Sequence, residues 1–472
     1  MRGDEDRAGR ALEGLTRACP YLFLVLSLVG TLFLAWNLPP FQGADELAHV
    51  NRALIGSTGH LVGERATKQG RQIAGGVIEW SVYNATHPFN DIRFNTWAKA
   101  DTADYVVAGQ ARWGGRTFVA DFRGSAMYPP FFYVPATAGF MIAKGADLPV
   151  VQSLYLARMS QAVACCLIGF LALLLAGGSR LLLYSVLLLP MSLGLYSALT
   201  NDGMMIAVTA LGCALICRPL SQGRPMQGRE LAAAAICFAL VGMTKAPYAL
   251  FGLVLLAVDS VVPPRRWKAA ALVIAASAAW NLFTAIAVQV PLVNLANATD
   301  PGAQIRYLLG DPLRIPELAV RTLASNWRAY SQAFIGVLGW LDTFMPKPYY
   351  PAAWTMLILA AAASASWKRP PQWRALPWAT VLIWLGAFGA IHGALYVTWN
   401  RVGSPIVEGV AGRYFLPLAC FLALALEGAR PLVPDTAWGR RLRLGMTAAV
   451  LAFPLITLMI VQRTIIVRYY LD

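Results

Sequence analysis

Two adjacent carboxylates and a histidine follow the first long apolar run of the chain, which covers roughly residues 19–36. Residues 39–49 read PPFQGADELAH, so Asp45, Glu46 and His49 lie where a membrane span would meet water. Glycosyl transfer to an alcohol needs a carboxylate that takes the hydroxyl proton as the anomeric carbon develops oxocarbenium character. We therefore take these three as candidate catalytic residues, with Asp45 as the base and its neighbours orienting the acceptor.

A structural interpretation of the same residues stays open. Residues 46–55 have helical periodicity, and Asp45 could simply cap that helix at its N-terminus. In such a helix Asp45, His49 and Arg52 share one face, which makes Arg52 a candidate substrate-binding residue. The carboxylate pair is also compatible with a bound Mg²⁺ or Mn²⁺, although two ligands do not define a metal site.

Three cations lie inside or at the ends of apolar runs, namely Arg158, Lys245 and Arg413. A cation at mid-helix depth costs about 2.5–3.5 kcal/mol on insertion scales, so it usually faces a partner or a polar cavity. A lipid-linked phosphate is such a partner, and arginine can hold it through two hydrogen bonds. The alternatives are snorkelling to the surface and internal salt bridges with Asp202 or Glu408.

Two further segments carry candidate substrate-binding residues. Residues 336–346 read GVLGWLDTFMP, where Trp340 and Asp342 suit a sugar-stacking platform and suit an interfacial anchor equally well. Residues 197–202 read SALTND, a polar break in which Asn201 and Asp202 could bind substrate or form a connecting turn.

The composition identifies an integral membrane protein. Of 472 residues, 57% are hydrophobic and 13% are charged, against about 25% charged in soluble domains. Apolar runs near the length that crosses a bilayer recur along the chain, and we predict an all-α, polytopic fold with about eleven transmembrane helices. They are expected near 18–38, 150–177, 181–199, 203–218, 230–245, 247–262, 269–290, 351–367, 376–398, 412–429 and 444–462.

The net charge of +15 reflects topology rather than nucleic-acid binding, because the basic residues cluster in short links between apolar runs. Assigning these links to the cytoplasm predicts the following segments. They are a cytoplasmic N-terminus (1–17), a first helix (18–38), an exterior loop (39–149), helices two to seven (150–290), a second exterior loop (291–350) and helices eight to eleven (351–472). The Tyr128–Lys144 segment is short and contains three prolines, so we expect a re-entrant or interfacial helix.

Several chemistries have no sequence signature here. The seven cysteines lie in or beside apolar runs, where they are expected to be small core residues, and they form no zinc pattern. The chain has no Walker loop, dinucleotide fingerprint or nucleophile elbow. A reaction that uses a soluble nucleotide at a cytoplasmic P-loop is therefore not expected.

Ordered motifs along almost the whole chain resemble a family of bacterial polytopic membrane proteins placed near the C-type (GT-C) glycosyltransferases. The matching motifs are FQGADE with His49 and Arg52, YPPFFY (128–133), SALTND, KAPY (245–248), GWLDT (339–343) and GVAGRYFLP (409–417). The resemblance implies a sugar donor on a polyprenyl phosphate at the exterior face and an acidic catalytic base in the first exterior loop, which maps to Asp45. Ala44 and Ala411 depart from the family pattern, which commonly has proline and often has glutamine there.

The resulting hypothesis is an inverting glycosyltransferase of the bacterial inner membrane that acts on a surface glycan or glycolipid at the periplasmic or exterior face. The candidate substrate-binding residues are Arg52, Tyr128, Arg158, Asn201, Asp202, Lys245, Trp340, Asp342, Arg413 and Tyr414. Two other hypotheses remain: a transporter or flippase of a lipid-linked glycan, and a non-catalytic subunit of a polysaccharide assembly complex. The flippase needs the same cations but no base.

Overall fold

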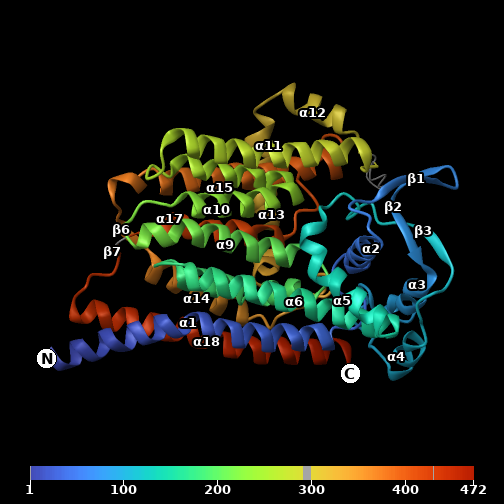
Figure 1. Cartoon of the computed structure of the whole chain (residues 1–472), viewed down its shortest axis with the longest axis horizontal. Helices are drawn as coiled ribbons and strands as arrows, with labels where there is room; N and C mark the ends of the chain where they lie inside the picture. Colours follow the sequence, from blue (N-terminus) through green and yellow to red (C-terminus); the bar gives the residue numbers. More distant parts are fainter. Residues whose placement is uncertain (1, 291–298, 429, 472) are drawn as a thin grey trace.

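The computed structural model describes residues 2–290, 299–428 and 430–471. Most of the chain is helical, and the long helices run nearly side by side as one elongated bundle (Figure 1). A smaller mixed region closes one end of the bundle; we call it the cap and define it as residues 46–145. The C-terminus lies at the cap end and the N-terminus at the opposite end (Figure 1).

Six helices within the described residues are long and apolar enough to cross a membrane. They are α1 (Arg2–Asn37), α6 (Val150–Leu175), α9 (Asn201–Ser221), α11 (Pro263–Ala287), α15 (Leu376–Trp399) and α18 (Ala437–Tyr469). Helix α9 is the most enclosed, because 83% of its apolar stretch is buried, whereas α11 and α15 bury 22%. The core therefore surrounds α9, which packs against α6, α10 and α16.

The other predicted spans are broken or short. Helices α7 (Arg180–Leu187) and α8 (Pro190–Ser197) meet at 61°, where Pro190 begins the second helix. The shorter apolar elements are α10 (Gly228–Thr244), η3 (Ala246–Ala257), α14 (Tyr349–Ser364), α16 (Leu416–Phe421) and α17 (Ala423–Leu426). Even the 17 residues of α10 rise only about 26 Å, less than the roughly 30 Å of a bilayer core. The chain is thus a multi-pass membrane protein, but a count of eleven spans is not confirmed.

The cap contains a small sheet that the all-α prediction missed. Strands β1 (Glu64–Lys68), β2 (Arg71–Glu79) and β3 (Thr117–Asp121) form an antiparallel sheet in the order β1-β2-β3. Its helices are α2 (Glu46–Ser57), α3 (Trp80–Thr86), η1 (His87–Ile92), α4 (Thr102–Gly109), η2 (Pro130–Tyr133) and α5 (Val134–Gly145). The sheet was not predicted because β1 is polar and almost entirely exposed, so its residues do not alternate between apolar and polar. Helix α5 has twelve residues and packs on α6 and α2.

Between α11 and α14 the described chain forms two helices and a hairpin: α12 (Pro301–Leu309), α13 (Arg314–Ile335), β4 (Val337–Leu338) and β5 (Thr343–Phe344). Residues 291–298, which begin the predicted second exterior loop, lie outside the described residues, as does residue 429 in the predicted span 412–429. The remaining elements are β6 (Ser366–Lys368), η4 (Pro371–Trp373), η5 (Gly412–Phe415) and β7 (Arg430–Pro431). All seven cysteines are buried and free, as small core residues would be.

Candidate functional site

Four charged side chains from distant parts of the chain meet where the cap joins the bundle. Lys245 Nζ lies 2.5 Å from Asp202 Oδ1, Arg413 Nε lies 3.5 Å from Asp202 Oδ2, and Arg413 Nη2 donates to Asp45 Oδ2 at 2.8 Å. We call Asp45, Asp202, Lys245 and Arg413 the ion cluster. The Asp45 side chain is 56% exposed, whereas that of Arg413 is 9% exposed. Asp45 is therefore the solvent-facing end of a largely buried chain of charges.

Local sequence places each member of the cluster at the end of an element. Pro247 prevents α10 from continuing, so Lys245 lies at the join between α10 and η3. Asp202 lies in the first turn of α9, where the helix dipole favours a negative charge. Arg413 lies on η5, next to Gly412, where a Cβ atom would clash with the backbone of α13 at Tyr330. Glycine thus allows η5 to bring Arg413 into the cluster.

Asp45 does not act as the helix cap that the structural interpretation expected. It precedes α2 with φ 61°, in the left-handed region, and its side chain makes no capping hydrogen bond. A non-glycine residue in this conformation stores backbone strain, which is often found at functional sites. Burial raises the pKa of Asp45, but the neighbouring Arg413 lowers it by more, so the net pKa lies below its ordinary value and the carboxylate is ionised at neutral pH.

His49 lies beside the cluster within a set of tyrosines. Its Nδ1 lies 2.6 Å from the Tyr133 hydroxyl, and its ring stacks on Tyr128 and Tyr133. Burial lowers the pKa of His49 to about 4, although Asp202 and Asp45 oppose this shift. The imidazole is therefore neutral at pH 7, and it can orient or relay a hydrogen bond rather than add a positive charge.

Tyr414 supports the two cations of the cluster. Lys245 Nζ lies 4.5 Å from the centre of the Tyr414 ring, and the Arg413 guanidinium carbon lies 5.5 Å from it. The Tyr248 hydroxyl donates to the Tyr414 carbonyl oxygen at 2.7 Å. Sequence reasoning did not select Tyr133 or Tyr248, although both belong to motifs (YPPFFY and KAPY) that it quoted.

Glu46 and Arg158 form a separate pair that has no contact with solvent. Arg158 donates to both carboxylate oxygens of Glu46, at 2.6 and 2.7 Å, and both side chains are fully buried. Glu46 also accepts from the backbone N–H groups of Gly43 and Leu199. The sequence interpretation gave Glu46 a catalytic role and Arg158 a substrate-binding role. In the structure each of these side chains holds the other, and the pair anchors the segment that carries Asp45. The roles assigned from the sequence stay predictions.

The Arg52 guanidinium also makes its hydrogen bonds inside the protein. Its Nε and Nη2 donate to the Tyr128 carbonyl oxygen at 2.9 and 2.8 Å, and Nη2 also donates to the Leu61 carbonyl oxygen. Its side chain is fully buried, 5.3 Å from the Tyr133 ring centre. Arg52 therefore positions the tyrosines that flank His49.

The β4–β5 hairpin carries Trp340 and Asp342 in different roles. The Arg93 guanidinium lies 3.7 Å from the centre of the Trp340 ring, and Phe94 contacts the same ring edge-on. Asp342 accepts from Arg468 of α18 at 3.0 Å, and both side chains are largely buried. Arg468 also donates to cap carbonyls at Ile92, Asn95 and Ala98. No sequence signal marked Arg93 or Arg468.

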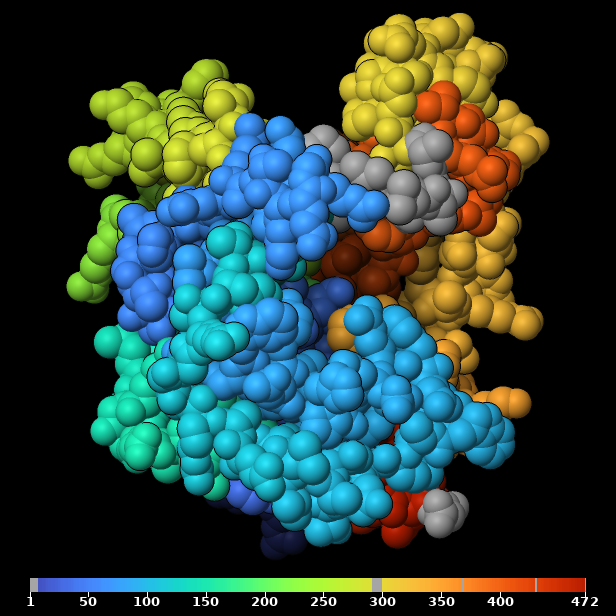
Figure 2. All heavy atoms as spheres, turned by 90° about the vertical axis from the view of Figure 1, so that its right-hand side faces the viewer, coloured from blue at the N-terminus to red at the C-terminus, as the bar shows by residue number. Residues whose placement is uncertain are grey.

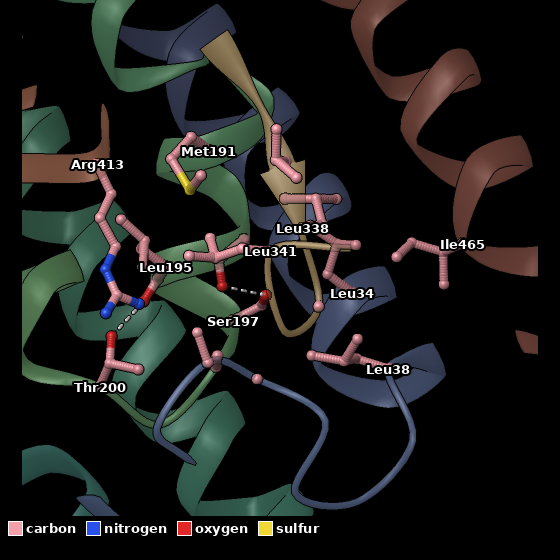
Figure 3. Close-up of a pocket in the computed structure, with 16 residues that line it drawn as sticks. Leu34, Leu38, Met191, Leu195, Ser197, Thr200, Leu338, Leu341, Arg413 and Ile465 are labelled. Atoms are coloured by element: carbon pink, nitrogen blue, oxygen red, sulfur yellow. Dashed lines mark hydrogen bonds between the residues drawn. The ribbon is translucent and has the colours of Figure 1, made fainter. Parts of the chain in front are cut away.

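A small apolar pocket, with a cavity volume of about 30 Å³, adjoins the ion cluster. Its lining includes Leu34 of α1, Leu38 just after α1, Met191 and Leu195 of α8, Leu338 of β4 and Ile465 of α18. Figure 3 shows Arg413 reaching the pocket from the side opposite Ile465. The pocket thus offers a hydrocarbon lining with one guanidinium at its edge.

A second hollow, with a cavity volume of about 240 Å³, lies on the other side of residues 42–45. More polar residues line it than line the first pocket, and we call it the polar hollow. Asp45 and Trp340 both line it. The face at the cap end is hollowed between the blue surface of the cap and the orange surface of later segments (Figure 2). Asn201, at the start of α9, is buried, and its Nδ2 has no partner among the described residues.

The arrangement of the described side chains gives little support to the divalent cation that the sequence analysis considered. In the described part of the chain, no group of three or more His, Cys, Asp or Glu side chains could hold a metal ion. Asp45 and Asp202 are instead neutralised by Arg413 and Lys245. The four formal charges of the ion cluster therefore sum to zero.

The sequence profile of a family described as "Predicted membrane protein (DUF2142)" matches residues 27–422. This range begins inside α1 and includes every residue of the ion cluster and every residue that lines the two pockets except Ile465. No curated protein and no solved structure shows significant similarity to the chain.

Proposed function

This chain belongs to the DUF2142 family of predicted membrane proteins, and on that premise we propose that it is a glycosyltransferase related to the GT-C enzymes. It transfers a sugar from a polyprenyl-phosphate donor to a surface glycan or glycolipid. The cap faces the periplasm or exterior of the bacterial inner membrane. The observation that carries the proposal is the exposed carboxylate of Asp45, held 2.8 Å from Arg413 between an apolar pocket and a polar hollow.

The donor fits the apolar side of this arrangement. Because the pocket is small, a polyprenyl chain must widen it to bury hydrocarbon against its lining. The phosphate then meets Arg413 at the pocket edge and Lys245, which shares Asp202 with Arg413. Both cations lie in a largely buried setting, where charge-assisted hydrogen bonds to phosphate are stronger than in water. The same cations stabilise the phosphate as it leaves.

Donor binding also changes the state of Asp45. In the structure Arg413 holds the pKa of Asp45 below its ordinary value, which makes the carboxylate a weak base. A bound phosphate competes for the Arg413 guanidinium, because both are anions that seek the same donors. Asp45 is then released and becomes more basic only when the donor is in place.

The chemical step follows from these positions. Asp45 takes the proton of the acceptor hydroxyl, whose oxygen forms a bond to the anomeric carbon of the sugar. The bond between that carbon and the phosphate oxygen breaks, and its electron pair leaves with the polyprenyl phosphate. Attack from the face opposite the leaving group inverts the anomeric configuration. His49, neutral at pH 7, orients the acceptor or Asp45.

The test is a transfer assay with purified protein in lipid nanodiscs, a panel of polyprenyl-phosphate sugars and a crude surface-glycan acceptor. We expect turnover by the native protein and a loss of about 100-fold or more in Asp45→Asn, the usual contribution of a general base. Asp435→Asn is the matched control, because Asp435 is an exposed acid that follows β7 and pairs with Arg440.

Two results would contradict the proposal. Near-native turnover by a correctly inserted Asp45→Asn protein would exclude Asp45 as the base. Failure to turn over any donor, together with movement of the lipid-linked sugar across a vesicle bilayer, would identify a flippase instead.

A further inference from the structure

The segment from Gln42 to Asp45 separates two spaces of different chemistry. Gly43 and Ala44 line the apolar pocket, whereas Gln42 and Asp45 line the polar hollow. The two inner residues of this short turn therefore face the apolar pocket, and the two outer residues face the polar hollow. A ligand in the polar hollow reaches the exposed carboxylate of Asp45 without entering the apolar pocket.

The polar hollow is lined by amides and aromatic side chains, mostly from the cap. They include Gln42, Asn51, Tyr83, Asn90, Arg93 and Trp340. Planar polar groups beside aromatic rings suit a ligand that presents both hydroxyl groups and apolar C–H faces. The cavity volume of about 240 Å³ accommodates a small ligand such as a single sugar ring.

Three residues of this hollow carry a buried polar atom that lacks a partner among the described residues. Gln42 donates through Nε2 to the Phe89 carbonyl oxygen at 2.9 Å, but its Oε1 is unpartnered. Asn51 Oδ1 and Trp340 Nε1 are likewise unpartnered. Gln42 is 3% exposed and Asn51 is 1% exposed. Buried polar groups are nearly always hydrogen-bonded, so two acceptors and a donor at one hollow point to a ligand that supplies the missing partners.

The fixed charges of the hollow favour a neutral ligand. Asp45 presents an exposed carboxylate, and Asp121 is engaged by Arg123 at 2.6 Å. The Arg93 guanidinium is engaged by the Trp340 ring at 3.7 Å. The ring contact leaves the Arg93 charge intact, but two carboxylates, Asp45 and Asp121, line the hollow beside this one cation, so the lining as a whole disfavours an acidic group.

We propose that the polar hollow is a binding site for a neutral, hydroxyl-rich saccharide, which serves as the acceptor. The inference rests on the proposed function for the role of acceptor, while saccharide binding itself can be measured without turnover. The sugar hydroxyls complete the hydrogen bonds of Gln42, Asn51 and Trp340. A ligand bound in this way places a hydroxyl beside the Asp45 carboxylate.

The experiment screens the full-length protein in nanodiscs on an array of bacterial surface oligosaccharides, followed by calorimetry with the tightest free oligosaccharide. We expect at least one neutral oligosaccharide to bind, and we expect about a ten-fold or greater loss of affinity in Asn51→Leu and in Trp340→Ala. Trp340→Phe keeps a ring but loses the N–H group, so it is expected to bind more weakly than the native protein and more tightly than Trp340→Ala. Trp438→Ala, at an exposed tryptophan of α18 near its start, is the matched control.

Binding of polyprenyl phosphate to each variant is measured in parallel and is expected to stay within two-fold, which also shows that the variants are folded. Absence of saccharide binding, binding confined to acidic saccharides, or native affinity in both hollow variants would overturn the inference. Asp45→Asn is expected to keep saccharide binding while losing transfer. Saccharide binding without transfer from any donor would contradict the proposed enzyme activity but would support the saccharide site.

Discussion

Asp45 and Glu46 are neighbours in the chain, yet their carboxylates bind different arginines on opposite sides of the segment. Asp45 is largely exposed and pairs with Arg413 at 2.8 Å, whereas Glu46 is fully buried and pairs with Arg158 at 2.6 Å. One turn thus carries an exposed carboxylate and a buried carboxylate that anchors it. We therefore expect substitutions at Asp45 and at Glu46 to have different effects.

The buried pair should matter for stability. Arg158→Ala leaves Glu46 with an unpaired buried charge, which typically costs about 3–5 kcal/mol. We expect a clear fall in the thermal unfolding temperature of the purified protein. Arg17→Ala is the matched control, because Arg17 pairs with Glu13 at the same 2.6 Å but on an exposed surface, where such pairs contribute little. Equal effects of the two substitutions would contradict the anchoring role.

His49 should make stability depend on pH. Its pKa falls from an ordinary 6.5 to about 4 on burial, so between these values the unfolded chain binds more protons than the folded protein. The free energy of unfolding is therefore expected to fall as the pH is lowered from 6.5 to 4, by about 3 kcal/mol in total. Thermal unfolding across this range should show the decline in the native protein and a weaker decline in His49→Gln.

The control for His49 is His87→Gln, because His87 is an exposed histidine of the cap. This variant is expected to keep the native pH dependence. A decline of the same size in His49→Gln as in the native protein would show that other groups cause it.

Lys245 should affect donor binding rather than the base. In Lys245→Met the phosphate loses one of its two proposed cations, while Asp45 and Arg413 keep their contact. We expect the KM for the polyprenyl-phosphate sugar to rise about ten-fold, equivalent to about 1.4 kcal/mol. Lys268→Met is the control, since Lys268 is an exposed lysine of α11. An unchanged donor KM would remove Lys245 from the phosphate site.

Gly339 should control the position of Trp340. It has φ 62°, and a Cβ atom there would clash with the Tyr469 hydroxyl. Gly339→Ala is expected to distort the β4–β5 hairpin, and to weaken both transfer and saccharide binding by about ten-fold or more, because Trp340 follows directly. The measurement is oligosaccharide affinity beside the unfolding temperature.

The matched substitution for Gly339 is Gly389→Ala in α15. A Cβ atom at Gly389 meets nothing within 4 Å, and alanine favours the helix. It is expected to leave saccharide affinity unchanged and to stabilise the protein slightly. If Gly339→Ala behaved like Gly389→Ala, the hairpin would not position Trp340.

Much of the architecture could be predicted from composition and periodicity. Long apolar runs such as those of α6, α15 and α18 became long apolar helices, because a span must satisfy its backbone hydrogen bonds internally. Elements with a weak sequence pattern were not predicted. Strand β1 is polar and exposed, and Pro190 breaks the apolar run that forms α7 and α8. In the sequence, short apolar helices such as α14 resemble membrane spans, because local hydropathy does not show where a helix ends.

The sequence by itself indicated candidate residues: the types of Asp45, His49, Asp202, Lys245 and Arg413, and their places near the ends of apolar runs, predict a functional site. Only the tertiary structure decided which of them meet. Asp45 and Arg413 are separated by 368 positions, and the direction of each side chain depends on how helices pack and end. Neighbouring residues at a helix start point about 100° apart, so Glu46 turns inward to Arg158 while Asp45 stays open to solvent.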